Sequence, residues 1–200
     1  MTKLSVAASS TPPEELLDAA ERLLVSDGYA AVSTRRLAEE AGLNHGLIHY
    51  YFGSMDELFI QVLERFTQRL IGRQRQMYGQ PHTPFSEKWR SAVAFLEEDA
   101  VSGYQKLWLE LQAMAWNRPE LAERIAAVNG AWRQVLTEAF TLAADELEID
   151  NEAVPVPALV SLVMTFNQGL ILERLSGVTD GHDELLGVIE GWFSSRQRAT

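Results

Sequence analysis

The fold is decided by residues Ser33–Phe59, which read STRRLAEEAGLNHGLIHYYFGSMDELF. Apolar side chains recur along this stretch at intervals of three and four residues, as they do on one face of a helix. Ala41-Gly42-Leu43-Asn44 interrupts the pattern, because glycine lets the chain turn sharply and asparagine caps a following helix. Two short helices joined by such a turn form a helix-turn-helix arrangement.

Helical spacing continues on both sides of this stretch, and no segment alternates as strands do. Capping residues and Gly or Pro breaks divide the chain into about nine helices, so we predict an all-α fold. Three short helices lie between Pro12 and Gly53. The longer helices are predicted at residues 54–79, 85–101, 103–116, 118–147, 155–176 and 182–195.

This pattern predicts three parts of unequal size. Residues 1–11 are small and polar without periodicity, so we expect a flexible arm. Residues 12–57 hold the helix-turn-helix domain, and residues 58–200 form a larger helical body.

The composition is that of an ordinary globular protein, with 46% apolar and 22% charged residues in 200. The sequence contains no cysteine, which excludes disulfides and thiolate metal sites. No secretion signal and no membrane-length apolar run is visible, so we expect a soluble cytoplasmic protein with no membrane partner. The net charge of −11 argues by itself against nucleic-acid binding.

The second short helix of the pair has two chemically different faces. Four side chains are expected to face the core: Leu47, Ile48, Tyr51 and Phe52. Four residues share the outer face: His45, Gly46, His49 and Tyr50. Short polar donors around a glycine that permits close approach are suited to the DNA major groove.

A metal site and an enzyme are the alternatives to this interpretation. His45 and His49 have the spacing of a helical zinc pair, but no third ligand lies nearby in the sequence. The sequence also lacks a Ser/His/Asp or Cys/His set and a phosphate-binding glycine loop. We therefore expect no catalytic site, metal or cofactor.

The stretch from Glu15 to about Leu63 resembles the DNA-binding segment of the TetR family of bacterial transcriptional regulators. The shared positions include Gly28, Thr34, Leu37-Ala38, Ala41-Gly42, Gly46, Tyr51-Phe52, Ser54 and Leu58-Phe59. The resemblance implies contacts with a double-stranded DNA operator. The residues implied are Ser33, Thr34, Arg35, Arg36, Asn44, His45, Gly46, Leu47, His49, Tyr50, Tyr51 and Ser54.

The helical body is rich in aromatic residues between Trp89 and Trp132. Aromatic side chains with a few polar groups are the usual lining of a small-molecule site. The resemblance implies an effector pocket in this body, and the lining suggests an apolar or aromatic effector. The candidates are Trp89, Tyr104, Trp108, Met114, Trp116 and Arg133.

Residues Pro155–Leu175, PVPALVSLVMTFNQGLILERL, are apolar on most faces of a helix. Such a helix must be buried on most sides, and a second copy of the chain can supply the cover. The resemblance likewise implies a two-fold homodimer, which presents two reading helices to a palindromic site. The interface candidates are Ala158, Ser161, Leu162, Thr165, Gly169, Leu172 and Trp192.

These features predict a ligand-responsive repressor that binds its operator as a homodimer and is released by a small effector. Activation instead of repression stays open, since sequence does not set the sign of regulation. A helical dimer that binds a small molecule or a protein, with weak or lost operator affinity, is the alternative. It rests on the acidic residues 12–57 and on Met55, where the family usually has lysine.

Overall fold

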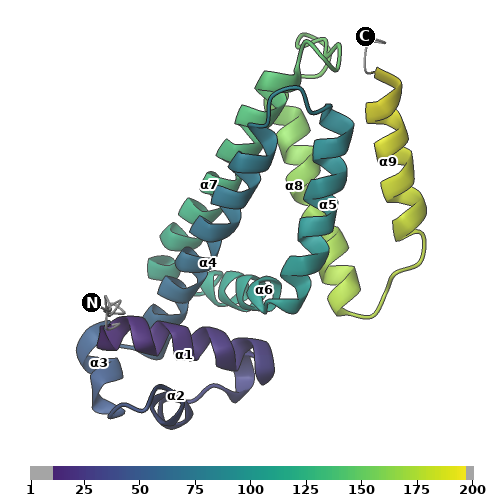
Figure 1. Cartoon of the computed structure of the whole chain (residues 1–200). Coiled ribbons are helices and arrows are strands. Elements are labelled where there is room, and N and C mark those ends of the chain that lie inside the picture. The colour runs from purple at the N-terminus through teal and green to yellow at the C-terminus, as the bar shows by residue number, and fades with distance from the viewer. Residues whose placement is uncertain (1–10, 197–200) are drawn as a thin grey trace, which may run out of the picture. The chain divides into compact units, whose positions relative to one another are not determined.

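The computed structural model describes residues 11–196, which form nine α-helices and no strand (Figure 1). The predicted all-α fold is confirmed. The helices are α1 Pro12–Ser26, α2 Thr34–Ala41, α3 Gly46–Phe52, α4 Met55–Tyr78, α5 Phe85–Val101, α6 Tyr104–Ala115, α7 Pro119–Ala143, α8 Val156–Leu175 and α9 His182–Arg196. The arm predicted for residues 1–11 lies outside the described residues, except for Thr11.

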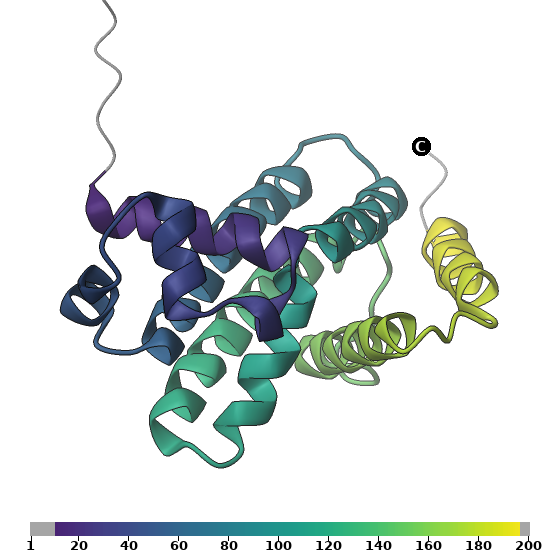
Figure 2. The same ribbon diagram turned by 90° about the horizontal axis from the view of Figure 1, so that it is seen from below.

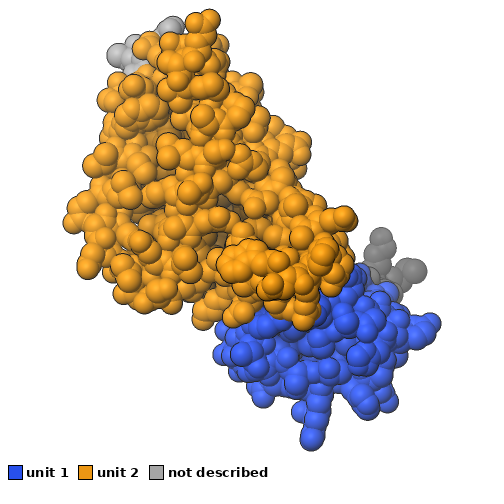
Figure 3. Space-filling view, turned by 180° about the vertical axis from the view of Figure 1, so that it is seen from behind, with its two compact units in different colours: residues 1–64 blue, residues 65–200 orange. Residues whose placement is uncertain are grey.

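The chain divides into two compact units, residues 1–64 and residues 65–200 (Figure 3). The division falls within α4, as does the predicted boundary between residues 57 and 58. Helix α4 therefore belongs to both units, and it is continuous over 24 residues.

Capping side chains fix the ends of the short helices in unit 1. Ser33 Oγ accepts a hydrogen bond from the Arg36 amide at 3.3 Å, which caps α2. Gly42 ends α2 in the left-handed region, with φ of 66°. Asn44 Oδ1 then accepts from the Gly46 amide at 2.8 Å and holds the first turn of α3. The Ser33 cap, the left-handed Gly42 and the Asn44 hydrogen bond thus account for the turn predicted from the sequence.

The core of unit 1 draws on all four of its helices. Figures 1 and 2 show α2 and α3 on the same side of α1. One fully buried side chain from each helix meets there: Leu16, Leu37, Ile48 and Leu58. Burying each such side chain stabilises the unit by about 1.5–3 kcal/mol.

Unit 2 is held together by an aromatic cluster between α5, α7 and α9. The Phe85 ring lies 5.4 Å from Phe140 and 5.0 Å from Phe193, measured between centroids. Helix α5 lies beside α9 (Figure 1), and Arg90 Nε donates to Glu190 Oε1 at 3.0 Å. These contacts join chain segments that are about a hundred residues apart in the sequence.

One helix ends earlier than expected. Helix α7 ends at Ala143 rather than at residue 147, and residues 144–148 form turns that close with the Ile149 amide on the Ala144 carbonyl and Glu148 at φ of 50°.

Helix α8 is, among the described residues, the one helix long and apolar enough to cross a membrane by length and composition. Only 17% of its most apolar window is buried within the chain, so much of α8 lies uncovered.

Candidate functional site

The residues predicted to contact DNA lie together on α2, α3 and the segments that cap them. None of the twelve is buried, and ten of them are exposed. Thr34 and Leu47 are partly covered. The structure therefore brings these residues to one outer region of unit 1.

Tyr51 differs from the expectation that it faces the core of unit 1. Ile48 and Phe52 are buried, but Tyr51 is 39% exposed and Tyr50 is 76% exposed. The two tyrosine rings pack edge to face, with centroids 4.9 Å apart. Because the buried stripe of this short helix follows the i, i+4 pair Ile48 and Phe52, Tyr51 lies at its margin.

His49 has a fixed ring orientation on the outer face of α3. Its Nδ1 atom lies 3.0 Å from the carbonyl oxygen of Gly53. A carbonyl only accepts, so Nδ1 carries the proton in this bond. In the neutral ring Nε2 is then an acceptor, and it becomes a donor only when the imidazole is protonated.

Each arginine between residues 11 and 64 forms an ion pair within unit 1. Arg35 Nε lies 2.8 Å from Glu39 Oε1, and the hydrogen bond and charge of Glu39 raise the pKa of Arg35. Arg22 Nε lies 2.7 Å from Glu40 Oε1. Arg36 pairs with Asp27. Sequence reasoning missed this pairing, although Arg35 and Glu39 stand at the i, i+4 spacing that favours it.

A metal centre finds no support in the geometry around His45 and His49. Within the part of the chain that the structure describes, no group of three or more His, Cys, Asp or Glu side chains could hold a metal ion.

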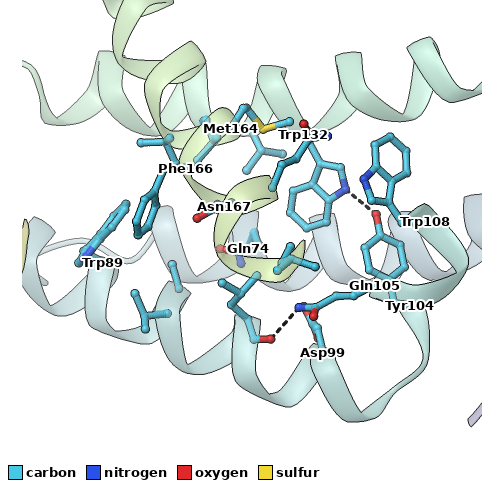
Figure 4. A pocket seen from close by; sticks show the side chains of 18 of the residues that line it. Gln74, Trp89, Asp99, Tyr104, Gln105, Trp108, Trp132, Met164, Phe166 and Asn167 are labelled. Atoms are coloured by element: carbon cyan, nitrogen blue, oxygen red, sulfur yellow. Dashed lines mark hydrogen bonds between the residues drawn. The ribbon is translucent and has the colours of Figure 1, made fainter. Parts of the chain in front are cut away.

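Unit 2 contains a largely apolar cavity lined by residues of α4 to α9 (Figure 4). Its volume is about 120 Å³, comparable with the cavity of about 150 Å³ that accommodates benzene in an engineered protein. Three of the six predicted pocket residues line it: Trp89, Tyr104 and Trp108.

The other three predicted pocket residues lie elsewhere. Trp116 stands at the end of α6 and is 79% exposed. Arg133 is exposed and donates to Ser161 Oγ on α8 at 2.5 Å. Met114 is half-buried and does not line the cavity. An aromatic-rich segment thus indicated the region but not which face of each helix points inward.

Several lining residues were not predicted. Gln74 from α4 and Met164, Phe166 and Asn167 from α8 lie outside the aromatic segment. Asp99, Gln105 and Trp132 lie within the segment but were not among the predicted residues.

Hydrogen bonds order one end of the cavity. Trp132 Nε1 donates to the Tyr104 hydroxyl at 2.7 Å, and Thr67 Oγ1 lies 3.2 Å from the same oxygen. Burial raises the pKa of Tyr104. Burial also raises the pKa of Asp99, although Arg73 Nη2 lies 2.6 Å from its Oδ1 atom and opposes the rise.

An apolar face on α8 and α9 is exposed in the single chain. On α8 the exposed residues recur at intervals of three and four: Ala158, Leu162, Thr165, Gly169 and Leu172. Leu185, Val188 and Trp192 continue the pattern on α9. We call these eight residues the α8–α9 face. Six of the seven predicted interface residues belong to it, and the seventh, Ser161, is half-buried beside Arg133.

Comparison with known proteins gives these surfaces a family context. Residues 16–62 match the family described as bacterial regulatory proteins, tetR family. The chain is similar to the transcriptional repressor AcnR of Corynebacterium glutamicum, with 24% identity over 96% of this chain and 100% of AcnR. It is also similar to the transcriptional activator FasR of Mycolicibacterium smegmatis, with 31% identity over 47% of this chain and 44% of FasR.

Solved structures agree in fold along nearly the whole chain. A putative transcriptional regulator from Rhodococcus sp. RHA1 superposes with a TM-score of 0.76 at 19% identity, over 93% of this chain and 95% of that one. The FadR regulator of Bacillus subtilis, in complex with stearoyl-CoA, superposes with a TM-score of 0.69 at 17% identity, over 93% and 98%. Residues 16–62 thus resemble the N-terminal domain of the bacterial tetR regulators, and the solved structures share the fold of nearly the whole chain.

Proposed function

We propose that the protein is a homodimeric repressor that acts in the cytoplasm, binds a palindromic operator through α2 and α3, and is released by a small effector. The observation that carries the proposal is the exposure of all the outer-face residues of α3, including Tyr50 at 76%. The outer face thus presents a tyrosine and two histidines, which can donate hydrogen bonds, to solvent. Contact with base edges and phosphates gives these side chains a function.

Specific roles follow from side-chain chemistry. The guanidinium group of Arg35 has the planar fork that binds two acceptors of guanine, once it leaves Glu39. His45, Gly46 and Leu47 begin α3 and are assigned to base edges. Thr34, His49, Tyr50 and Tyr51 are assigned to the phosphate backbone, which positions the protein without reading sequence.

Dimerisation is supported by the α8–α9 face. One side of the strongly apolar α8 is exposed, and water is a poor cover for Leu162 on α8 or Val188 on α9. A second copy packed through the same face gives the isologous interface of a two-fold dimer. Gly169 has no atom within 4 Å of the position its Cβ would take, which leaves room for a partner helix to approach.

Release by an effector requires that the ligand bind two conformations with different affinity. The cavity lies in unit 2, whereas the operator-binding residues lie in unit 1. Helix α4 contributes Gln74 to the cavity and begins just after Ser54, which is assigned to the operator. A shift of this helix is therefore the proposed route between the two sites.

The test is fluorescence anisotropy of the purified protein on labelled DNA from upstream of its own gene, over a salt series, with unrelated DNA of equal length. We expect saturable binding to the upstream fragment alone, lost in Arg35→Ala and in His45→Ala. Leu142→Ala, at an exposed position on α7, is the matched control and should bind as the wild type does.

Absence of binding to either fragment at low salt would instead favour a dimeric binding module without operator affinity. The ion pairs of Arg22, Arg35 and Arg36 with carboxylates are the observation that favours this alternative. A reporter placed behind the bound fragment would distinguish repression from activation.

A further inference from the structure

The charged groups that line the cavity in unit 2 are acidic only. Among residues 11–196, Asp99 is the one charged residue that lines it, and no Lys, Arg or His side chain does so. The remaining polar side chains are amides, hydroxyls and indoles (Figure 4). A buried carboxylate without a free cation beside it makes the cavity unfavourable for a second anion.

The cation nearest to Asp99 is already bound. Arg73 donates through Nη2 to Asp99 Oδ1 at 2.6 Å and through Nη1 to Glu98 Oε2 at 3.1 Å. Its guanidinium carbon also lies 4.0 Å from the centre of the Phe95 ring. Arg73 does not line this cavity, so it is not available to an incoming ligand.

Two acceptor groups line the cavity, the Asp99 carboxylate and the Gln74 amide oxygen. Asp99 bonds to Arg73 through Oδ1. Gln74 is 9% exposed, and its Oε1 atom is buried without a hydrogen-bond partner. An unpaired buried acceptor destabilises the protein, and a hydrogen bond from a ligand would relieve this.

Two donors of the cavity lining are used within the protein. Gln105 Nε2 donates to the Leu96 carbonyl at 2.9 Å, and Trp132 Nε1 donates to Tyr104. Trp89 Nε1 is a donor without a partner, and Figure 4 shows Trp89 at the opposite end of the cavity from Tyr104 and Trp132. The donors of this lining, which include the amides of Asn167 and Gln168, are neutral and do not offset the charge of the Asp99 carboxylate.

We propose that this cavity binds small aromatic molecules whose polar end is a hydroxyl or an ammonium group, directed at Asp99 and Gln74, and that it rejects the matching carboxylates. This inference rests on the proposed function in taking the cavity as the effector site. The apolar walls, among them Phe166 and Val163, bury the ring. The hydroxyl or ammonium group donates a hydrogen bond to the unpartnered Gln74 oxygen or to the Asp99 carboxylate.

The test uses four molecules that share a phenylethyl group and differ in the end group: 2-phenylethanol, 2-phenylethylammonium, propylbenzene and 3-phenylpropanoate. Binding is followed by tryptophan fluorescence, because Trp89, Trp108 and Trp132 line the cavity. We expect the alcohol and the ammonium to bind at least about tenfold more tightly than the carboxylate, with propylbenzene between them.

Two variants at neighbouring positions sharpen the result. Asp99→Asn removes the buried charge and frees Arg73, so the ammonium loses its advantage and the carboxylate gains affinity. Glu98→Gln also removes a negative charge next to Arg73. The Glu98 side chain is 63% exposed and does not line the cavity, so we expect the four molecules to keep the same order of affinity as in the wild type. If Asp99→Asn does not fold by circular dichroism, Gln74→Leu serves instead and weakens the alcohol more than propylbenzene.

A carboxylate that binds as tightly as the alcohol, an unchanged order in Asp99→Asn, or no binding by any of the four overturns the inference. The titration contains no DNA. Selective ligand binding without operator binding therefore refutes the proposed function alone, and operator binding without the expected ligand order refutes this inference alone.

Discussion

Replacing Leu162 by glutamate is expected to separate the proposed dimer into single chains. Full burial of a leucine contributes about 1.5–3 kcal/mol, and Leu162 is 66% exposed in the single chain. About two-thirds of that amount, roughly 1–2 kcal/mol for each copy, is thus available to the interface. Two symmetric copies lose about 2–4 kcal/mol, which raises the dissociation constant about 30- to 1,000-fold.

This range is a lower bound, because the two introduced carboxylates must also leave water. Sedimentation equilibrium over a wide range of protein concentrations measures the dissociation constant directly. Leu142→Glu is the control, since Leu142 is an equally large leucine, 75% exposed, on α7 outside the α8–α9 face. A wild-type chain that stays monomeric, or a Leu162→Glu chain that dimerises as Leu142→Glu does, would refute the reasoning.

Three further outcomes are expected. Tyr104→Phe leaves the Trp132 indole without an acceptor and lowers the free energy of unfolding by about 1–3 kcal/mol in urea titrations. Glu39→Gln frees Arg35 for a phosphate, so operator binding strengthens and log K falls more steeply with log salt, by about 0.9 in slope. Burial raises the pKa of Asp99, so folding favours the protonated acid. The wild type therefore gains stability over Asp99→Asn as pH falls through that raised pKa, and the gain is complete below the pKa of the unfolded chain.

For each of these outcomes, a control variant or a contradicting result can be named. Tyr50→Phe removes an exposed hydroxyl and should leave the unfolding free energy unchanged, so an equal loss in both variants contradicts the hydrogen-bond argument. The gain from Glu39→Gln must vanish when Arg35→Ala is added, because the argument acts only through that arginine. A stability difference between wild type and Asp99→Asn that is the same at every pH contradicts the assignment for Asp99.

The all-α fold and the turn at Gly42 were predictable because their causes are local. Helix periodicity, a left-handed glycine and the capping side chains of Ser33 and Asn44 act within a few residues of one another. The end of α7 was not predictable in the same way. The turns that follow α7 include Glu148 at positive φ, a conformation that glutamate seldom adopts.

The cavity was predictable only in part, since its lining depends on contacts between distant segments. The aromatic-rich segment held Trp89, Tyr104 and Trp108, but periodicity alone does not say which tryptophan faces inward. Trp116 lies about two turns beyond Trp108, just after the end of α6, and faces solvent. Gln74 lines the cavity together with residues of α8 that are about ninety positions later in the sequence. No local sequence pattern reveals that these segments meet.

In the proposed dimer, the exposed apolar surface of α8 makes the folding stability of the protein depend on its concentration. If two copies cover this surface, the folded state is linked by mass action to the amount of protein present. Each tenfold dilution then removes about 1.4 kcal/mol from the stability of the assembled pair. The melting temperature should therefore rise with protein concentration. In a cell that makes few copies, the protein would be less stable to unfolding than in a cell that makes many.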